Sequence, residues 1–423
     1  MVDLRDELNA NGTHVQPDTP QVQLRLLARL GQALCTGGDP VSSTRDALLR
    51  VTRTFGIQDI EIGVLPTLVF IRAGQDAPAV EVASVAASGP DKTLRLDQIS
   101  VLYAIVRQVE SGRLSAVDAM ARVDEMWRLP PRFGLAARVL GHAILVVGLG
   151  LILTPRLNAL IWCVGLGLLV GLAKELGEQW ETTDVLLPVV ASLLVSLIVF
   201  RATMAGQIVS PLLLLIPPLI TFLPGGMLTT AMIELADGNP ISGATRLIAG
   251  ATQVLLLVFG IVAGESLVGI AADQAYAIRT DNLIGWWAPV VGPLVFAIGI
   301  ELNSVGPPRS LPWLIFVVYV AWAGESVGSA TLGGYVGGFF GALVMTVVAY
   351  TVDRFPSAPP SRVLFLPAFW LLVPGSLAVV SVAELVGSDL EVSVAKLTAT
   401  AFTIVAIALG VLVGVAVSRR ARR

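Results

Sequence analysis

Glutamates lie within or beside long apolar stretches of this chain, where acidic residues are rare. They are Glu175, Glu234, Glu265, Glu301, Glu325 and Glu384. A carboxylic acid in a low-dielectric setting holds its proton more tightly than in water, so it can bind and release a proton near neutral pH. The candidates for such proton coupling are Glu175, Glu234, Glu265, Glu325 and Glu384. The alternative for each of them is a solvated loop residue.

Glu325 is the most isolated of these acids in the sequence. Ala323 and Gly324 precede it, and no cation lies nearby, whereas Glu175 directly follows Lys174. We therefore expect Glu325 to lie in an apolar, small-residue environment and to titrate during the protein's working cycle.

Prolines and glycines interrupt two apolar stretches in the same order. The first stretch holds Pro217, Pro224, Gly225 and Gly226, and the second holds Pro367, Pro374 and Gly375. A proline removes an amide donor and clashes with the preceding helical turn. Free backbone groups are tolerated inside a bilayer only where protein or water satisfies them. The pattern predicts two broken helices whose ends can hold a zwitterion, and these residues are our candidate substrate-binding residues. The alternative is a kink that serves only packing.

The two stretches belong to an internal duplication. Ile216 to Gly264 can be laid without a gap on Leu366 to Gly414, and the types that coincide are prolines, glycines and one acid, Glu234 with Glu384. Composition alone does not align such residues in apolar sequence. The same offset places Glu175 on Glu325.

Composition identifies the class of protein. The chain has 423 residues, 55% hydrophobic and 14% charged, with a mean hydropathy of +0.78. It is therefore expected to be a polytopic α-helical membrane protein. We predict ten spans, at about 135–153, 157–173, 185–201, 207–234, 244–271, 285–305, 311–326, 330–352, 363–386 and 395–417. The net charge of -3 argues against nucleic-acid binding.

A small soluble α+β domain is expected before the spans. Residues 1–20 are polar and predict a disordered tail, and 21–133 form the domain. Helical periodicity at 22–34 is followed by period-two stretches at 59–65, 67–72 and 80–86, and then by helices at 96–111 and 115–126. The pattern predicts an antiparallel sheet backed by helices.

Lysine and arginine set the orientation. The flanks on the side of the soluble domain hold most of them, whereas the opposite flanks hold only Arg156, Arg201, Arg279 and Lys396. Both termini, with the basic tail 418–423, are therefore expected in the cytoplasm. An odd number of crossings separates the duplicated stretches, so 134–272 and 284–417 should be two inverted five-span repeats. This is a recurring plan of secondary transporters that work by alternating access.

Other chemistry finds little support in the sequence. Gly324 to Gly328 fits GxSxG, but its flanks are helical rather than strand and helix, so we do not expect an enzyme. No metal-ligand spacing or nucleotide fingerprint is present, and we expect neither metal nor cofactor. Two rivals stay open: a gated channel for small metabolites, and a membrane-tethered sensor or enzyme acting through the N-terminal domain. The oligomeric state is also open, a homo-oligomer included.

Short motifs of the soluble domain resemble the threonine/serine exporter family of bacteria. They are Arg25 to Gly31, the turn Thr36 to Asp39, Thr54 to Gly56, Pro66-Thr67, Ser111 to Ala119, and Pro130-Pro131 at the entry to the membrane. The ten-span remainder, which some members carry as two chains, is similar too. The resemblance implies export of threonine and serine across the bacterial cytoplasmic (inner) membrane, driven by the proton-motive force.

The orientation can be tested by cysteine accessibility. Single cysteines placed near Ser88 and Ala421 should resist an impermeant thiol reagent in intact cells, because both positions are expected in the cytoplasm. Ready labelling at either position would contradict the inverted ten-span topology.

Overall fold

The computed structural model describes residues 19–73, 79–84, 94–154, 156–177, 183–277, 284–372, 379–382 and 390–420. Most of the predicted tail, together with Pro374, Gly375 and Glu384, lies outside these residues. Contacts divide the chain into two compact units. The first comprises Met1–Asp39, Ser43–Ala86 and Val101–Leu129, and the second comprises Pro40–Ser42, Ala87–Ser100 and Pro130–Arg423.

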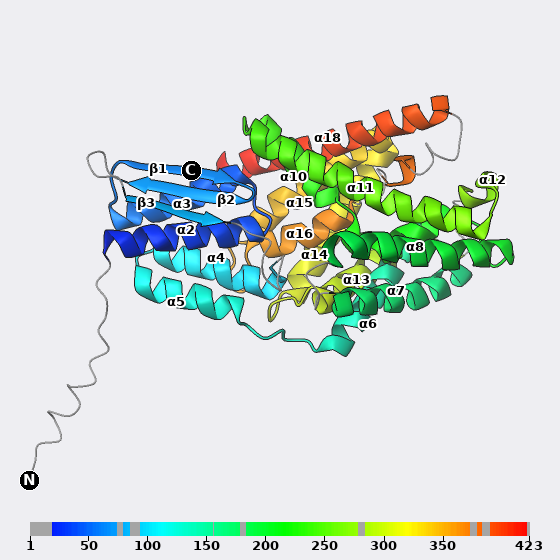
Figure 1. Cartoon of the computed structure of the whole chain (residues 1–423), viewed down its shortest axis with the longest axis horizontal. Helices are drawn as coiled ribbons and strands as arrows, with labels where there is room; N and C mark the ends of the chain where they lie inside the picture. Colours follow the sequence, from blue (N-terminus) through cyan, green and yellow to red (C-terminus); the bar gives the residue numbers. More distant parts are fainter. Residues whose placement is uncertain are drawn as a thin grey trace, which may run out of the picture. The chain divides into compact units, whose positions relative to one another are not determined.

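The first unit is an α+β fold (Figure 1). Its elements are α2 (Pro20–Thr36), most of α3 (Val41–Phe55), β1 (Ile60–Leu65), β2 (Leu68–Ala73), β3 (Ala79–Ser84), most of α4 (Leu96–Glu110) and α5 (Ala116–Trp127). The strands form an antiparallel sheet in the order β1-β2-β3. Helix α2 packs on the sheet, and Gly31 fits directly against Val69. The fully buried Leu27, Leu30 and Ile71 form part of the core, so apolar burial stabilises this unit.

The second unit is built from long apolar helices. They are α6 (Leu135–Leu153), α7 (Leu157–Gly177), α8 (Thr183–Met204), α9 (Pro211–Leu219) with η1 (Ile220–Phe222), α10 (Gly225–Ala236), α11 (Pro240–Val268), the short α12 (Ala272–Ala275), α13 (Trp287–Asn303), α14 (Leu311–Leu332), α15 (Gly334–Val352), α16 (Ser361–Leu371) and α18 (Leu390–Arg420). Among the described residues, six helices are long and apolar enough to cross a bilayer, and the bent pair α9–α10 brings the number to seven if it is counted as one span. The chain is therefore a multi-pass membrane protein, as predicted.

The number of spans stays a prediction. A helix lies at each of the ten predicted positions. Three of these apolar helices are shorter than a full span in the part of the chain that the structure describes: Trp287–Asn303, Val336–Val352 and Ser361–Leu371.

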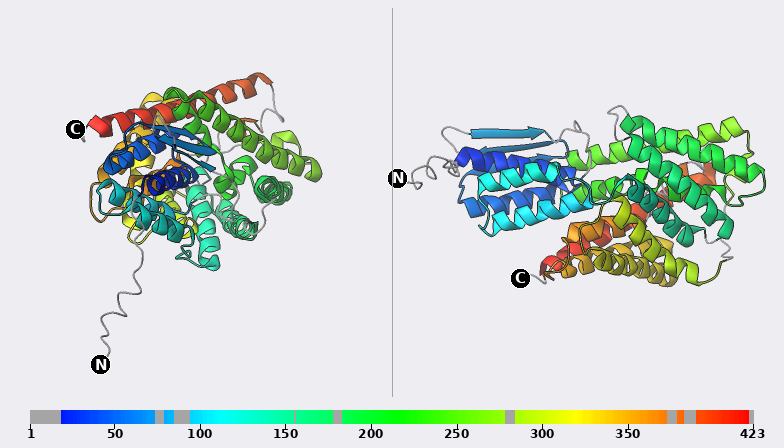
Figure 2. Two further views of the ribbon diagram at one scale, coloured as in Figure 1. Left: turned by 60° about the vertical axis from the view of Figure 1, so that its left-hand side comes forward. Right: turned by 90° about the horizontal axis from the view of Figure 1, so that it is seen from below.

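Helix boundaries follow the duplication seen in the sequence. Helices α9 and α16 begin at the aligned residues Pro211 and Ser361, and α11 and α18 begin at the aligned Pro240 and Leu390. Helices α8 and α11 lie side by side, as do α15 and α18 (Figure 2). The two halves therefore repeat a helix pair as well as a sequence.

Glycines make the same close contacts in these two helix pairs. A side chain at Gly260 would collide with the Val189 carbonyl and press on the Leu193 amide. A side chain at Gly410 would meet the carbonyl and amide of the aligned residues Phe339 and Leu343. Small residues of this kind let helix backbones approach closely inside a membrane.

Glycine substitution tests this repeated packing. Gly260→Ala and Gly410→Ala should each lower the melting temperature of the purified protein, because the added methyl meets backbone that cannot move aside; the expected cost is roughly 1–3 kcal/mol. Gly165→Ala in α7 is the matched control, since nothing lies within 4 Å of its added methyl. Gly410→Ala protein that melts no lower than Gly165→Ala protein would contradict equivalent packing.

Candidate functional site

The span between Ser210 and Asp237 is broken in the middle. Pro211–Phe222 and Gly225–Ala236 meet at an angle of 66°. Pro224 occupies the N-cap of α10, and Gly225 and Gly226 begin that helix. The break predicted from Pro224 and Gly225 is thus observed. Pro217 lies before it, buried inside α9, and the helix continues past it to Leu219.

The break divides the span into nearly equal halves. Helix α9 with η1, and helix α10, are each roughly 18 Å long at a rise of about 1.5 Å per residue. Together they exceed the roughly 30 Å of a hydrocarbon core. A pair of this length that crossed a bilayer as one span would place its break near the middle of the hydrocarbon core.

Polar side chains surround the break. The hydroxyls of Thr221 and Thr229 are buried and have no hydrogen-bond partner among the described residues. Gln253 of α11 donates from Nε2 to the Phe222 carbonyl at 3.3 Å. A methyl group added at Gly226 would meet nothing within 4 Å. The site thus has open space and unused hydrogen-bonding capacity, which a buried native site rarely leaves unfilled.

Sequence reasoning missed these three polar residues. Two threonines and one glutamine within apolar runs are a visible signal. However, the sequence alone does not show that Gln253, in the next helix, reaches the carbonyl at the break.

The second half offers a partial counterpart. Helix α16 contains Pro367, as α9 contains Pro217, and it ends at Leu371. Pro374 and Gly375 lie outside the described residues, so the second break stays a prediction.

Two of the candidate acids are paired with cations. Glu175 of α7 forms an ion pair with Arg138 of α6, with 2.6 Å between the nearest nitrogen and oxygen, and both side chains are largely buried. Glu234 of α10 is fully buried and accepts from Nε of Arg246 at 3.1 Å. The Val41 amide, which belongs to the same unit, donates to the same Glu234 oxygen at 3.1 Å. These contacts provide each carboxylate with a fixed partner.

Two further acids are held by hydroxyl groups. Glu265 accepts from the Tyr276 hydroxyl at 2.5 Å. Glu301, which sequence reasoning noted but did not select, accepts from Ser310 at 2.8 and 2.9 Å. Both contacts lie near helix ends, where they help to fix the following turn.

Glu325 differs from the other described acids. It makes no hydrogen bond or ion pair with any described residue, and its Cβ packs on Gly341 of α15. The aligned acid in the other half, Glu175, has Arg138. The duplication has therefore kept a carboxylate in both halves, and among the described residues a cation lies beside only one of them.

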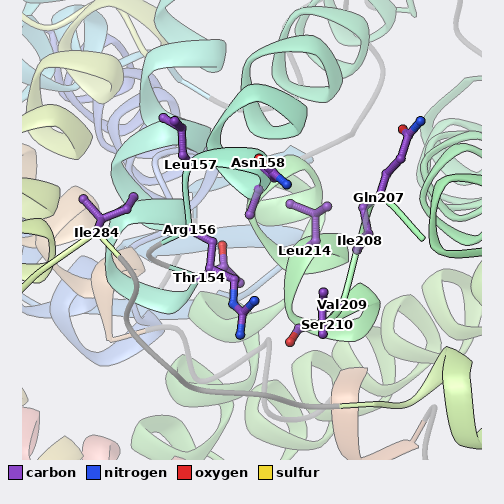
Figure 3. A pocket seen from close by; sticks show the side chains of 11 residues that line it. Thr154, Arg156, Leu157, Asn158, Gln207, Ile208, Val209, Ser210, Leu214 and Ile284 are labelled. Carbon is purple, nitrogen blue, oxygen red and sulfur yellow. The ribbon is translucent and has the colours of Figure 1, made fainter. Parts of the chain in front are cut away.

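A cavity of about 210 Å³ lies at the ends of several helices (Figure 3). Its lining comes from the α6–α7 connection, the α8–α9 connection, Leu214 of α9 and Ile284 before α13. The polar members are Thr154, Arg156, Asn158, Gln207 and Ser210. No motif in the sequence indicated it, because its residues come from three separate connections.

Among the described residues, no cluster of histidine, cysteine, aspartate and glutamate could hold a metal ion. The polar and acidic groups at these sites can form hydrogen bonds and ion pairs, and the carboxyl groups can exchange protons. Such groups bind and release small polar molecules.

Comparison with known proteins identifies the family. The sequence model of the ThrE family, described as threonine/serine exporter, matches residues 25–268, which is more than half of the chain. The match ends at Val268, the last residue of α11, shortly after Gly264, where the aligned stretch of the duplication ends. No curated protein and no solved structure matches the chain. The match confirms the resemblance seen in the motifs of the soluble domain: the chain belongs to the threonine/serine exporter family of membrane transporters.

Proposed function

We propose that this protein exports threonine and serine by alternating access, in exchange for protons. The observation that carries the proposal is the broken span α9–α10, which lies inside the part of the chain that matches the exporter family. Broken helices near the bilayer midplane form the substrate sites of many secondary transporters.

The break offers a partner for each group of a small hydroxy amino acid. The first amides of α10, at Gly225 and Gly226, form the positive end of a helix and suit a carboxylate. Carbonyls at the end of η1 suit an ammonium group. The unpartnered hydroxyls of Thr221 and Thr229 can bond the hydroxyl of threonine or serine. In this proposal Pro367, Pro374 and Gly375 provide the corresponding surface from the second half.

The clustering of helix ends supports the ten-span arrangement. The α6–α7 connection, the α8–α9 connection and Ile284 meet at one cavity. The opposite ends of α6, α7 and α13 meet through Arg138, Glu175 and Asn303: Asn303 donates to the Arg138 carbonyl at 3.2 Å and accepts from Lys174 at 3.5 Å. Successive connections along the chain thus lie at opposite ends of the helices, as expected for helices that cross the membrane one after another.

The proposal includes a domain plan. Residues 21–133 form a cytosolic α+β domain, 134–272 and 284–417 form inverted halves, and both termini lie in the cytoplasm. The membrane is the bacterial cytoplasmic membrane. Exchange of two related conformations between the halves would open the break to one side and then to the other.

Glu325 is our first choice for the proton carrier. It has no fixed partner among the described residues, whereas Glu175 and Glu234 have arginine partners. A carboxyl group without a competing cation can gain and lose a proton without breaking an ion pair. Glu265 and Glu384 are the remaining candidates.

Efflux measurement tests the function directly. Cells fed a threonine-containing dipeptide should export threonine faster with this protein than without it, and should do so against a concentration gradient. Export that only follows the gradient would indicate a gated channel. Unchanged efflux of both threonine and serine would refute the exporter assignment.

The proton carrier can be separated from a structural acid. Export by the wild type should rise when the outside medium is acidified at constant internal pH, because more protons are then available to enter. Glu325→Gln should remove this dependence and leave the melting temperature unchanged. Glu175→Gln should instead lower the melting temperature, because Arg138 is left buried without its partner, at a cost of roughly 3–5 kcal/mol. An unchanged pH response in Glu325→Gln protein would make Glu325 structural.

The break can be tested by removing one hydroxyl. Thr229→Val should keep or raise thermal stability, because a buried hydroxyl without a partner is lost, while threonine affinity falls roughly fivefold or more. Thr346→Val is the control, since the Thr346 hydroxyl bonds the Ala342 carbonyl within its own helix. Equal threonine affinity in the two well-folded variants would place the substrate elsewhere.

A further inference from the structure

The cavity shown in Figure 3 is separate from the helix break. Helix α9 and η1 connect them: Ser210 and Leu214 line the cavity, and Phe222 lies at the break. The segment from Leu214 to Phe222 spans roughly 12 Å. A small molecule in the cavity therefore does not reach Thr229 or Gly226.

Two helix N-termini converge on this cavity. Helix α7 begins at Leu157, and its first residues Leu157, Asn158 and Ala159 are part of the lining. Helix α9 begins at Pro211, directly after the lining residue Ser210, which occupies the N-cap without capping the helix through its side chain. Helix N-termini carry partial positive charge and favour an anion. Helix α7 adds its first amides, whereas α9 begins with Pro211, which has no amide hydrogen, and contributes partial charge only.

A positive side chain adds to this field. Arg156 precedes α7 and is the only charged residue among the described residues that line the cavity; none of these is acidic. In Figure 3 the guanidinium of Arg156 and the hydroxyl of Ser210 lie at the lower side of the view, and Asn158 lies above them. A carboxylate suits this combination, because guanidinium groups and helix amides both donate to its oxygens.

The remaining lining suits a small side chain. Leu157, Ile208 and Leu214 provide apolar contact, and Asn158 and Gln207 provide amides that donate and accept. The volume of about 210 Å³ lies below the range of roughly 300–1,000 Å³ that holds larger ligands. A compact α-amino acid with one methyl and one hydroxyl group matches both the size and the chemistry.

We propose that this cavity is a second amino-acid site, which binds the α-carboxylate through Arg156 and the N-termini of α7 and α9. The proposal rests on the function proposed above. In the topology of that proposal, the cavity faces the outside of the cell. An exported amino acid would pause there after it leaves the break, and external amino acid would occupy it first.

The test compares threonine with threoninol, which lacks the carboxylate. The protein is inserted in one orientation into liposomes that contain labelled threonine. Threonine or threoninol is then added outside, and we measure the external concentration of each compound at which its effect on efflux is half-maximal. Arg156→Gln should raise the value for threonine roughly tenfold or more, the cost of a lost charge-assisted hydrogen bond, and should leave that for threoninol nearly unchanged. Arg156→Lys should keep most of the discrimination.

Arg201→Gln is the matched control. Arg201 lies in the last turn of α8 on the same predicted side, is exposed, and does not line the cavity. It should leave both values unchanged. The proposal is overturned if Arg156→Gln protein keeps the wild-type ratio of the two half-maximal external concentrations, threonine to threoninol. It is also overturned if the substitution changes only the internal threonine concentration that half-saturates efflux. An Arg156 that holds a lipid phosphate would change the dependence on phosphatidylglycerol and keep that ratio, which also contradicts the proposal.

A binding measurement separates this proposal from the proposed function. Purified Thr229→Val protein, in which the break is weakened, should still bind labelled threonine, and the added Arg156→Gln change should lower that binding by a further factor of roughly ten or more. This readout needs no transport. Failure of export with Arg156-dependent binding would refute the exporter assignment alone, whereas export with Arg156-independent binding would refute the cavity site alone.

Discussion

An unpaired backbone group cannot face lipid, and this constraint governs the centre of the molecule. Pro224 removes an amide and ends one helical segment, so carbonyls and amides near the bilayer midplane need other partners. The protein provides one of them, from Gln253 to the Phe222 carbonyl. The unpartnered threonine hydroxyls beside it give the same region room for a polar ligand. The proposed site for a small amino acid would use the same chemistry that breaks the helix.

The glycines explain how helices are held around such a break. Gly260 and Gly410 bring α11 and α18 against the backbones of α8 and α15. Close backbone contact gains dispersion energy without long side chains. The rigid pairs α8–α11 and α15–α18 can therefore flank segments that move. Alternating access needs both a stable frame and a mobile break.

The sequence predicted the features that depend on local chemistry. Pro224 removes a helical hydrogen bond and the glycines after it lower the helix propensity, so the break could be predicted without a structure. The period-two pattern located all three strands to within about two residues. Contacts between distant residues were not predictable. Arg138 and Glu175 form an ion pair between two helices, and Gln253 bonds a carbonyl of a neighbouring segment. The cavity with Arg156 is lined by residues from three separate connections. Such sites depend on how helices pack, which periodicity does not specify.

The central claim is that the break in α9–α10 lines the substrate pathway, and labelling of Gly226→Cys tests it most directly. The added side chain would face open space, and the native Cys35 and Cys163 are buried. The rate of reaction with a water-soluble thiol reagent is measured with and without threonine. We predict that the cysteine reacts and that threonine and serine slow the reaction, whereas threoninol does so less. A cysteine that reacts at the same rate with and without threonine would contradict the claim.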